Sequence, residues 1–598
     1  MLLNHPLPLT VIWSVVFPLY VYGLGEIWNK LLKSERGLVW NLSTGLALSV
    51  FLQTLCLFWA IPLKMAYPIL LIFGCVFGLL GIWQKEWGSF CKIGKNNIWL
   101  LCCVFAILFS HYLRMLTPNG GAESFQYHYF LPKLFVEQGQ LDLTGFELYD
   151  ALLNVWGLEV LLSMPEYFGG LHFMMIQFWW LLVICCLQLY SATKMLFPEI
   201  NGLHSCLWML FCSFYSYLLW WSKPELLATG YSAYLISYLL SSKNKGDLSI
   251  AVGIALMFSS LLSFKITCLV LCFPILVATV YIRKEKTVWL LTCILACIFF
   301  LSPWIIFILE HKGGLGTFPT DNYSNFSAPL VDSYQKNSSM IPKFFKDTYH
   351  YFLLFKPGIF LFILGFPLFI WKFYKYWLLP IGLLFNWGLA FLLINDLTPF
   401  CDEFRYTSFT LFVIPMGAAI VSESIFKNNV LKILLITFFI AMTYQRLYTI
   451  NHETFKYHRS YLFGNQTFVE ATTKEGSLAY QVYLNNRSSD TEKLLHIGNG
   501  NYFVHGPSVI HVGSWSKNYP VWKYSTSEDL KAWLHGMGVK WILLERWRYE
   551  SFARGFGGVE YLNSPLTAYY AQSLLTLNSC EKFLVTGSDA RYSLYYFP

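Results

Sequence analysis

The 598-residue chain is poor in charge, because only 13% of its residues are Asp, Glu, Lys or Arg. Soluble domains usually carry about 25% charged residues. Hydrophobic residues make up 56% of the chain and aromatic residues 19%. The shortage of charge excludes a soluble globular protein and predicts a polytopic membrane protein. The lipid bilayer is therefore an expected partner.

A basic stripe is also missing, although the formal net charge is +8. Lys and Arg are scattered in short loops between apolar runs, which is the pattern of membrane topology and not of a nucleic-acid-binding surface. We therefore expect no nucleic acid partner. Residues 1–6 lack a charged segment and the first apolar run is long enough to span a bilayer, so no removable signal peptide is expected.

Metal and disulfide patterns are absent from the sequence. No CxxC or mixed Cys/His spacing suggests a metal, and 13 of the 15 cysteines fall in or beside apolar runs, where Cys behaves as a small hydrophobe. Cys401 and Cys580 are the two that could pair outside the membrane. No metal ligands and no cofactor can be assigned, and a divalent metal stays open.

Apolar runs of about 17 to 25 residues predict about 14 membrane spans. Bases then set the orientation: if residues 117–170 are outside, nearly every inside loop carries Lys or Arg, as the positive-inside rule expects. We expect a multi-pass protein of the cytoplasmic (inner) membrane with its C-terminal domain outside. The spans are centred near residues 17, 50, 75, 106, 181, 212, 234, 256, 274, 298, 361, 386, 417 and 440.

The part after residue 450 has the composition of a soluble domain. The pattern predicts a helix near 466–484, strands at 493–498, 508–513 and 539–545, and a helix that opens at Ser525 with Glu528 in a capping box. This alternation indicates a small α/β domain with a mostly parallel sheet. No Gly-rich phosphate loop follows a strand there, because GNGNYF at 498–503 has no helix after it.

Residues 117–170 form a long polar stretch between two apolar runs. Seven acids lie in it against a single base, Lys133: Glu123, Glu137, Asp142, Glu147, Asp150, Glu159 and Glu166. If residues 124–137 are helical despite Pro132, Glu123 and Tyr127 share one face, where a carboxylate could accept a proton from a hydroxyl. Solvated acids at a helix N-terminus are the simpler alternative. His128 by itself is expected to be a polar residue at the membrane interface, not a ligand.

Basic residues are expected at the same side of the membrane. Lys223 with Glu225 in SKPELL, Lys265 in SFKIT and Arg405 in DEFRYTSF all fall near outer ends of predicted spans. A lipid-borne phosphate would offset the cost of these charges near hydrocarbon. Snorkelling towards the headgroups is the alternative for each of them alone. The polar 310–350 loop is either a lid over such a site or a connector.

Several of these segments, in this order, resemble bacterial GT-C glycosyltransferases related to the protein O-mannosyltransferase and aminoarabinose-transferase group. The resemblance is carried by ESFQYHYFLPKLFVEQGQL, LLNVWGLEVLL, SKPELLATGYSAYL, SFKITCLVL, FRYTSFTLFVIP and the C-terminal stretch from HIGNGNYF to VKWILLE. It implies residues 1–96 as extra helices, 97–450 as a GT-C-like core and 451–598 as an outer α/β domain.

The resemblance implies a glycosyltransferase that moves a sugar from a polyprenyl-phosphate-linked donor to a glycan, lipid or protein acceptor. It makes Glu123 the catalytic base, although the family usually has Asp at this position. The residues implied around donor phosphate and substrate are Tyr127, His128, Lys133, Lys223, Glu225, Lys265, Arg405 and Tyr406, with Asp150 and Glu159 as second acids.

Two other functions stay open at this point. A transporter or flippase of lipid-linked glycans would also need cations near a lipid phosphate, but it commonly shows internal repeats and charges near the middle of spans. We see no obvious repeat in the sequence, and most ionisable residues collect at the predicted outer face. The second is a catalytically inactive membrane scaffold that uses the outer domain for binding.

Overall fold

The structure is a computed structural model, and it describes most of the N-terminal half of the chain and the framework of the C-terminal domain. The described residues are 7–32, 37–84, 97–117, 125, 128–141, 156–220, 222–241, 247–264, 287–312, 412–472, 476–497, 500–512, 527–545, 581–583 and 592–596.

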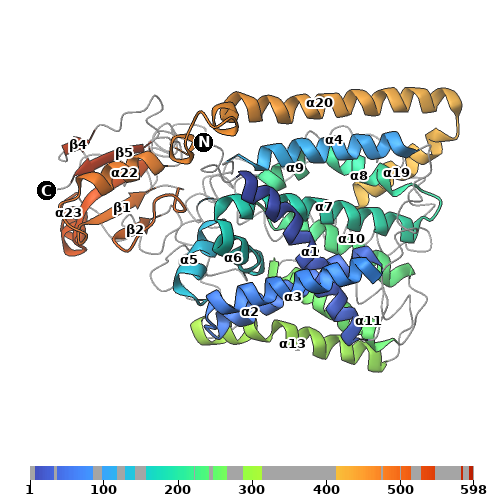
Figure 1. Cartoon of the computed structure of the whole chain (residues 1–598), viewed down its shortest axis with the longest axis horizontal. Coiled ribbons are helices and arrows are strands. Elements are labelled where there is room, and N and C mark those ends of the chain that lie inside the picture. Colours follow the sequence, from blue (N-terminus) through green and yellow to red (C-terminus); the bar gives the residue numbers. More distant parts are fainter. Residues whose placement is uncertain are drawn as a thin grey trace, which may run out of the picture.

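Helices account for nearly all of the described residues before 463, and they lie side by side in one bundle (Figure 1). They are α1 (Leu7–Leu31), α2 (Leu38–Phe58), α3 (Leu63–Gln84), α4 (Ile98–Met115), α5 (Phe130–Gln138), α6 (Gly157–Gly169), α7 (Leu171–Leu196), α8 (Gly202–Phe211), α9 (Ser213–Trp220), α10 (Glu225–Ser241), α11 (Leu248–Phe264), α13 (Thr287–Lys312), α19 (Val413–Phe426) and α20 (Asn429–Leu462).

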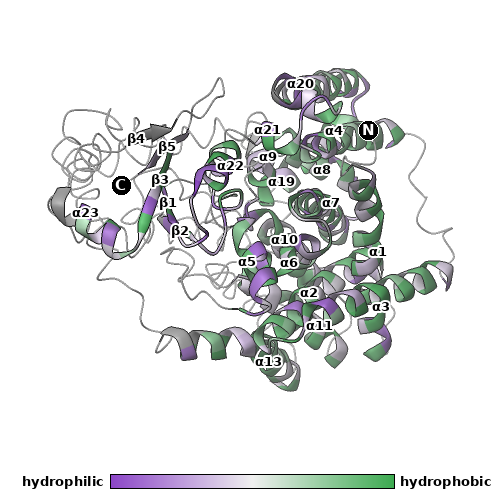
Figure 2. Ribbon diagram, turned by 60° about the vertical axis from the view of Figure 1, so that its left-hand side comes forward, coloured by the Kyte–Doolittle hydropathy of each residue, from purple (hydrophilic) through white to green (hydrophobic). Residues whose placement is uncertain are grey.

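Seven of the described helices are long and apolar enough to cross a membrane, namely α1, α2, α3, α4, α7, α13 and α20. Large apolar side chains are exposed along α3, α13 and α20, where a soluble protein would carry polar ones. Figure 2 shows hydrophobic residues over most of the bundle. The expected class, a helical multi-pass membrane protein, is confirmed. The exposed apolar side chains include Ile69, Ile72, Phe73, Leu79, Val288, Leu291, Leu295, Phe299, Val430, Ile433 and Leu434.

The single span expected near residue 212 is wrong. α8 ends at Phe211, Cys212 has an extended backbone (φ −75°, ψ 121°), and α9 begins at Ser213. One residue outside the helical region interrupts the ladder of hydrogen bonds and splits the apolar run into two short helices. The spans expected near residues 274, 361 and 386 lie outside the described residues.

The N-terminal helices α1, α2 and α3 pack closely on one another. A Cβ atom at Gly23 of α1 would lie 1.7 Å from the carbonyl oxygen of Gly74 in α3, so only glycine permits this approach of the two backbones. α1 also packs on α7, and all these helices share one hydrophobic core. The boundaries at 96 and 450 stay predictions, and α20 continues past residue 450 to Leu462.

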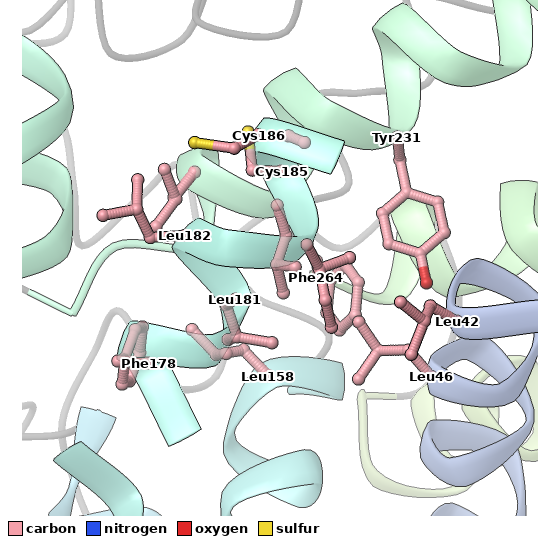
Figure 3. Close-up of a cluster of buried hydrophobic side chains, with 14 of the residues drawn as sticks. Leu42, Leu46, Leu158, Phe178, Leu181, Leu182, Cys185, Cys186, Tyr231 and Phe264 are labelled. Carbon is pink, nitrogen blue, oxygen red and sulfur yellow. The ribbon is translucent and has the colours of Figure 1, made fainter. Parts of the chain in front are cut away.

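The centre of the core lies where α2, α6, α7, α10 and α11 meet (Figure 3). α7 contributes Leu181 and Cys185, both completely buried, and Leu46 of α2 faces them. The hydroxyl of Tyr231 donates a hydrogen bond of 2.7 Å to the carbonyl oxygen of Ser43, which satisfies a polar group in this apolar region. This packing fixes the start of α6 and α10, which carry candidate site residues.

The C-terminal domain is built on a five-stranded sheet in the order β2-β1-β3-β5-β4. β1 pairs in parallel with β2 and β3, whereas β5 runs antiparallel to both β3 and β4. The small α/β domain is confirmed, but the mostly parallel sheet is wrong, because two of its four strand pairings, β3 with β5 and β5 with β4, are antiparallel. The elements are α21 (Phe468–Ala471), α22 (Ser477–Asn486), β1 (Lys493–Ile497), β2 (Val509–Val512), α23 (Ser527–Gly536), β3 (Val539–Glu545), β4 (Glu581–Phe583) and β5 (Tyr592–Tyr596).

The helix expected near 466–484 is also wrong, because α21 and α22 share this stretch. Gly476 precedes α22 with a left-handed backbone (φ 90°), a conformation that does not continue a helix. α21 begins with a capping box of Thr467 and Glu470. The capping box expected at Ser525 lies outside the described residues, and α23 begins at Ser527.

The stretch 117–170 is more than a polar loop, because it contains α5 and α6. Pro132 lies in the first turn of α5, where its missing N–H costs little. α6 is buried along its first nine residues, and a Cβ atom at Gly157 would lie 2.2 Å from Ser263 Oγ of α11. The acids of this stretch are therefore not all solvated: Glu159 is 5% exposed.

Candidate functional site

A buried acid–histidine pair connects the two halves of the stretch 117–170. His128 Nδ1 lies 2.7 Å from Glu159 Oε1, and the two residues are 3% and 5% exposed. A carboxylate only accepts, so Nδ1 donates this hydrogen bond. His128 is therefore not an interfacial side chain. Glu159 sets the orientation of the ring.

The turn between α9 and α10 contacts Tyr129, the residue after His128. Ser222 donates a hydrogen bond from its hydroxyl to the hydroxyl of Tyr129, the neighbour of His128. Its backbone is left-handed (φ 55°), which is uncommon for serine and is held here by the surrounding contacts. Two hydrogen bonds thus link His128 with Glu159 and Tyr129 with Ser222, and Lys223 follows Ser222 in the sequence. We call these five residues the polar cluster.

Lys223 and Glu225 are both completely buried within the protein. Snorkelling towards lipid headgroups therefore does not describe Lys223. Glu225 lies in the first turn of α10, where the positive end of the helix dipole favours a carboxylate. Of the predicted site residues, the structure thus shows His128 and Glu159 in direct contact, and it shows Lys223 and Glu225 as buried residues at the start of α10.

The other predicted residues lie outside the described part of the chain: Glu123, Tyr127, Asp150, Lys265, Arg405 and Tyr406. The same holds for the 310–350 loop, beyond the end of α13, and for Cys401 and Cys580. The convergence of Glu123, Lys265 and Arg405 on one cavity stays a prediction. Phe125, two residues after Glu123, has its ring centre 5.7 Å from that of Tyr129 in the polar cluster.

Lys133 contacts the C-terminal domain. Its Nζ donates a hydrogen bond of 3.1 Å to the carbonyl oxygen of Tyr502 and lies 5.0 Å from the centre of the Tyr502 ring. The Tyr502 backbone N–H donates to the carbonyl oxygen of Phe125, at 3.1 Å. Lys133 therefore holds the domain against the segment that follows Glu123.

The hydroxyl of Tyr502 completes this contact. It accepts a hydrogen bond from the Leu171 backbone N–H at 3.0 Å and donates to Glu166 Oε2 at 3.1 Å. Burial raises the pKa of Glu166 to about 7, against the lowering effects of the Lys133 charge and the Tyr502 hydrogen bond. Glu166, in the last turn of α6, therefore changes between its protonated and ionised forms near neutral pH.

A second contact joins Glu137 of α5 to a row of histidines. Glu137 Oε2 lies 2.7 Å from His505 Nε2, and His505 Nδ1 lies 3.3 Å from His511 Nε2. Burial raises the pKa of Glu137, but the hydrogen bond and charge of His505, with the charge of Lys133, outweigh it and leave this pKa lowered. Burial lowers the pKa of His511 and brings that of His496 to about 3.

Sequence reasoning misses these contacts, which we call the domain junction: Lys133, Glu137, Glu166, Tyr502 and His505. In the sequence, Glu137 and Glu166 are two acids among seven, and Tyr502 is part of the segment GNGNYF. Their partners lie more than 300 residues away in the sequence, so no spacing signals the pairing. The one local hint is a polar, Gly-rich segment directly after the buried strand β1.

A small cavity lies among α2, α11 and α13, next to the contact of Gly157 with Ser263. Hydroxyl groups of Thr54, Ser259, Ser260 and Ser263 line it. Ser260 is 4% exposed, and in the structure as described its Oγ has no hydrogen-bond partner. Ser263 comes two positions before the predicted donor residue Lys265 in the sequence, so the cavity lies by the C-terminal end of α11.

Metal ligands are not grouped in the described residues, where no three His, Cys, Asp or Glu side chains could hold a metal ion. The described cysteines are all free. Among the described residues, the ionisable groups of the polar cluster and the domain junction therefore offer proton transfer and charge stabilisation.

Comparisons with known proteins give a fold likeness and no sequence family. The sequence matches no protein-family model and no curated protein. The structure aligns with the oligosaccharyltransferase of Archaeoglobus fulgidus in complex with Zn and sulfate, with 11% identity, a TM-score of 0.43, and coverage of 76% of this chain and 70% of that chain. The oligosaccharyltransferase AglB of Archaeoglobus fulgidus, in complex with an inhibitory peptide and a dolichol-phosphate, aligns with 10% identity, a TM-score of 0.43, and coverage of 75% and 70%.

Proposed function

We propose that this chain is an integral-membrane glycosyltransferase of the GT-C class. It transfers a sugar from a polyprenyl-phosphate-linked donor to a glycan, lipid or protein acceptor at the outer face of the cytoplasmic membrane. The observation that carries the proposal is the polar cluster, in which the His128–Glu159 pair and Lys223 are all buried in an apolar bundle. Burying ionisable groups in a membrane protein is costly, and such groups mark a functional site by default.

The reaction would be a single displacement at the anomeric carbon. Glu123 takes the proton of the acceptor hydroxyl, whose oxygen forms the new bond to the sugar. The bond between that carbon and the donor's phosphate oxygen breaks, and polyprenyl phosphate leaves with the electron pair. Lys223, together with Lys265 and Arg405, stabilises the negative charge on the leaving phosphate. Glu159 holds the His128 ring in a fixed orientation.

The C-terminal domain has a supporting role in this proposal. The domain junction attaches it to Phe125, two residues from Glu123, and to α5 and α6, which lie in the stretch 117–170. Contacts at these positions would hold the base relative to the cations. Positioning of this kind matters, because a misplacement of about 1 Å can lower a rate roughly 100-fold.

Reconstitution in liposomes with a polyprenyl-phosphate-linked sugar tests the proposal. The transferase predicts a glycosylated product that is lost in Glu123→Gln, largely retained in Glu123→Asp, and retained in Asp142→Asn, a control acid from the same stretch. Full activity of Glu123→Gln would remove the base assignment. Movement of the lipid-linked sugar across the bilayer without transfer would identify a flippase, and neither activity would point to a scaffold.

A further inference from the structure

The small cavity among α2, α11 and α13 is lined by a buried hydroxyl group that lacks a partner. Ser260 of α11 is only 4% exposed, and its Oγ forms no hydrogen bond within the described part of the chain. A hydroxyl group that leaves water without gaining a hydrogen bond destabilises the folded protein. Buried polar groups of native proteins therefore almost always bond to another protein group or to an ordered water.

Three other hydroxyl groups line the cavity, and each of them donates its hydrogen to a backbone carbonyl oxygen. Thr54 Oγ1 of α2 donates to a carbonyl oxygen of its own helix at 2.8 Å, and Ser259 Oγ donates to one of α13 at 3.2 Å. Ser263 Oγ donates to the carbonyl oxygen of Ser260 at 2.7 Å. The oxygen of each hydroxyl still carries lone pairs that can accept a hydrogen bond. The cavity thus offers one donor, at Ser260, and three acceptors.

A water molecule matches these hydroxyl groups in hydrogen bonds, size and charge. It can accept one hydrogen bond from Ser260 and donate two to neighbouring hydroxyl oxygens, and buried waters typically form about three hydrogen bonds. The cavity has about 10 Å³ for the centre of a water molecule, which is about the space that one water needs. None of the described residues that line the cavity is charged, so nothing among them would balance the charge of a cation.

We propose that this cavity binds one ordered water molecule, which joins Thr54 of α2 to Ser260 of α11. The site is independent of the proposed transferase activity, because it uses only neutral hydroxyl groups. Phe300 and Trp304 of α13 belong to the same wall, so the water is a polar contact within apolar surroundings. It connects the N-terminal helices with α11, which ends directly before Lys265. A hydrogen bond through water is nearly as favourable in enthalpy as a direct one.

Thermal unfolding of the purified, detergent-solubilised full chain tests the site through the sign of one change. In a dry cavity, Ser260→Ala removes a hydroxyl group that has no partner, so the thermal midpoint would stay equal or rise. With a bound water, the same change removes a hydrogen bond of that water, and we expect the midpoint to fall by about 1–2 °C. An equal or higher midpoint would overturn the proposal.

A double-mutant cycle separates a contact through water from local effects of each change. Thr54→Val keeps the shape of the side chain without its hydroxyl, and no direct hydrogen bond joins Thr54 to Ser260 in the described residues. We expect Ser260→Ala and Thr54→Val together to lower the midpoint by less than the sum of the two single losses, because both remove the same water contact. Ser232→Ala, a buried serine of α10 outside the cavity, is the matched control and should add to Thr54→Val. Additive losses in both pairs would overturn the proposal.

An electron cryo-microscopy map of the wild type, at a resolution that shows ordered water, tests the site directly and needs no variant. We expect a density peak about 2.5–3.0 Å from both Ser260 Oγ and Thr54 Oγ1, the length of hydrogen bonds between oxygens. A peak surrounded by six or more oxygens at about 2.3–2.6 Å would assign the cavity to a cation and overturn the proposal. A Ser260 hydroxyl that is turned to the carbonyl oxygen of Leu256, without a peak in the cavity, would overturn it as well.

Discussion

Lys133 Nζ donates a hydrogen bond to the carbonyl oxygen of Tyr502 across 369 residues of sequence, at a distance of 3.1 Å. This bond joins a helix between two membrane spans to the C-terminal domain. The same tyrosine receives a hydrogen bond from Leu171 and gives one to Glu166, so one residue connects the domain with α5, α6 and α7. Tyr502 is therefore the centre of the domain junction.

Tyr502→Phe removes the hydroxyl while it keeps the ring. We expect a loss of about 1–3 kcal/mol in stability, because the Leu171 N–H and the Glu166 carboxyl lose a buried partner. The thermal midpoint of the detergent-solubilised protein measures the effect. Tyr595→Phe, at a half-buried position on β5, should leave the midpoint near that of the wild type, and an equal loss in both variants would contradict this role.

Glu166 should make stability fall as pH rises. Its pKa in the folded protein is about 7, above the ordinary value of 4.5, so the folded state holds a proton that the unfolded state has released. The contribution of Glu166 to the free energy of unfolding is full below pH 4.5 and is lost as the pH rises towards 7. The difference corresponds to about 3 kcal/mol at 1.36 kcal/mol per pKa unit.

Comparison with Glu166→Gln isolates this effect, because His496 and His511 act in the opposite direction. Burial lowers their pKa values, so their contribution is lost as pH falls below 6.5. We expect the difference in thermal midpoint between wild type and Glu166→Gln to change steadily between pH 4.5 and 7. A difference that does not vary with pH would contradict the raised pKa of Glu166.

Glu159 should be needed for transfer more than for folding. Glu159→Gln keeps an acceptor oxygen for His128 Nδ1 but removes the negative charge beside the ring. We expect the transfer rate to fall roughly 10- to 100-fold, as for a misplaced catalytic group, with a thermal midpoint close to that of the wild type. Glu470→Gln, at the exposed start of α21, serves as the control for loss of a carboxylate.

Gly157→Ala should weaken the contact between α6 and α11. The new Cβ would lie 2.2 Å from Ser263 Oγ and 2.8 Å from Ser263 Cβ, so one helix must move. Overpacking of this kind typically costs about 1–3 kcal/mol. Gly536→Ala is a matched control, since nothing lies within 4 Å of its Cβ position. Equal thermal midpoints for the two variants would show that α6 adapts without cost.

Local patterns predict the elements that depend on local sequence. Strands β1 and β3 lie within a residue of their predicted bounds, because each is a hydrophobic run with turn residues beside it. β4 and β5 are not predicted, since β4 has only three residues and β5 pairs with β3, which is distant in the sequence. The break at Cys212 has neither Gly nor Pro to signal it.

The candidate site, too, is only partly predictable from local sequence. Motif order is enough to name His128, Glu159 and Lys223, but their burial and the contact of His128 with Glu159 depend on how the helices pack. Contacts between helices distant in sequence decide which ionisable groups meet, and periodicity carries no information about them.

The helix α20 ends at Leu462 and α21 begins at Phe468, so only five residues, 463–467, separate the membrane helix from the first helix of the C-terminal domain. Fully extended, such a tether reaches about 17 Å. On a tether of this length, the domain cannot move far from the end of α20. Under the proposed function, an acceptor would have to come to a domain that is held close to the membrane helices.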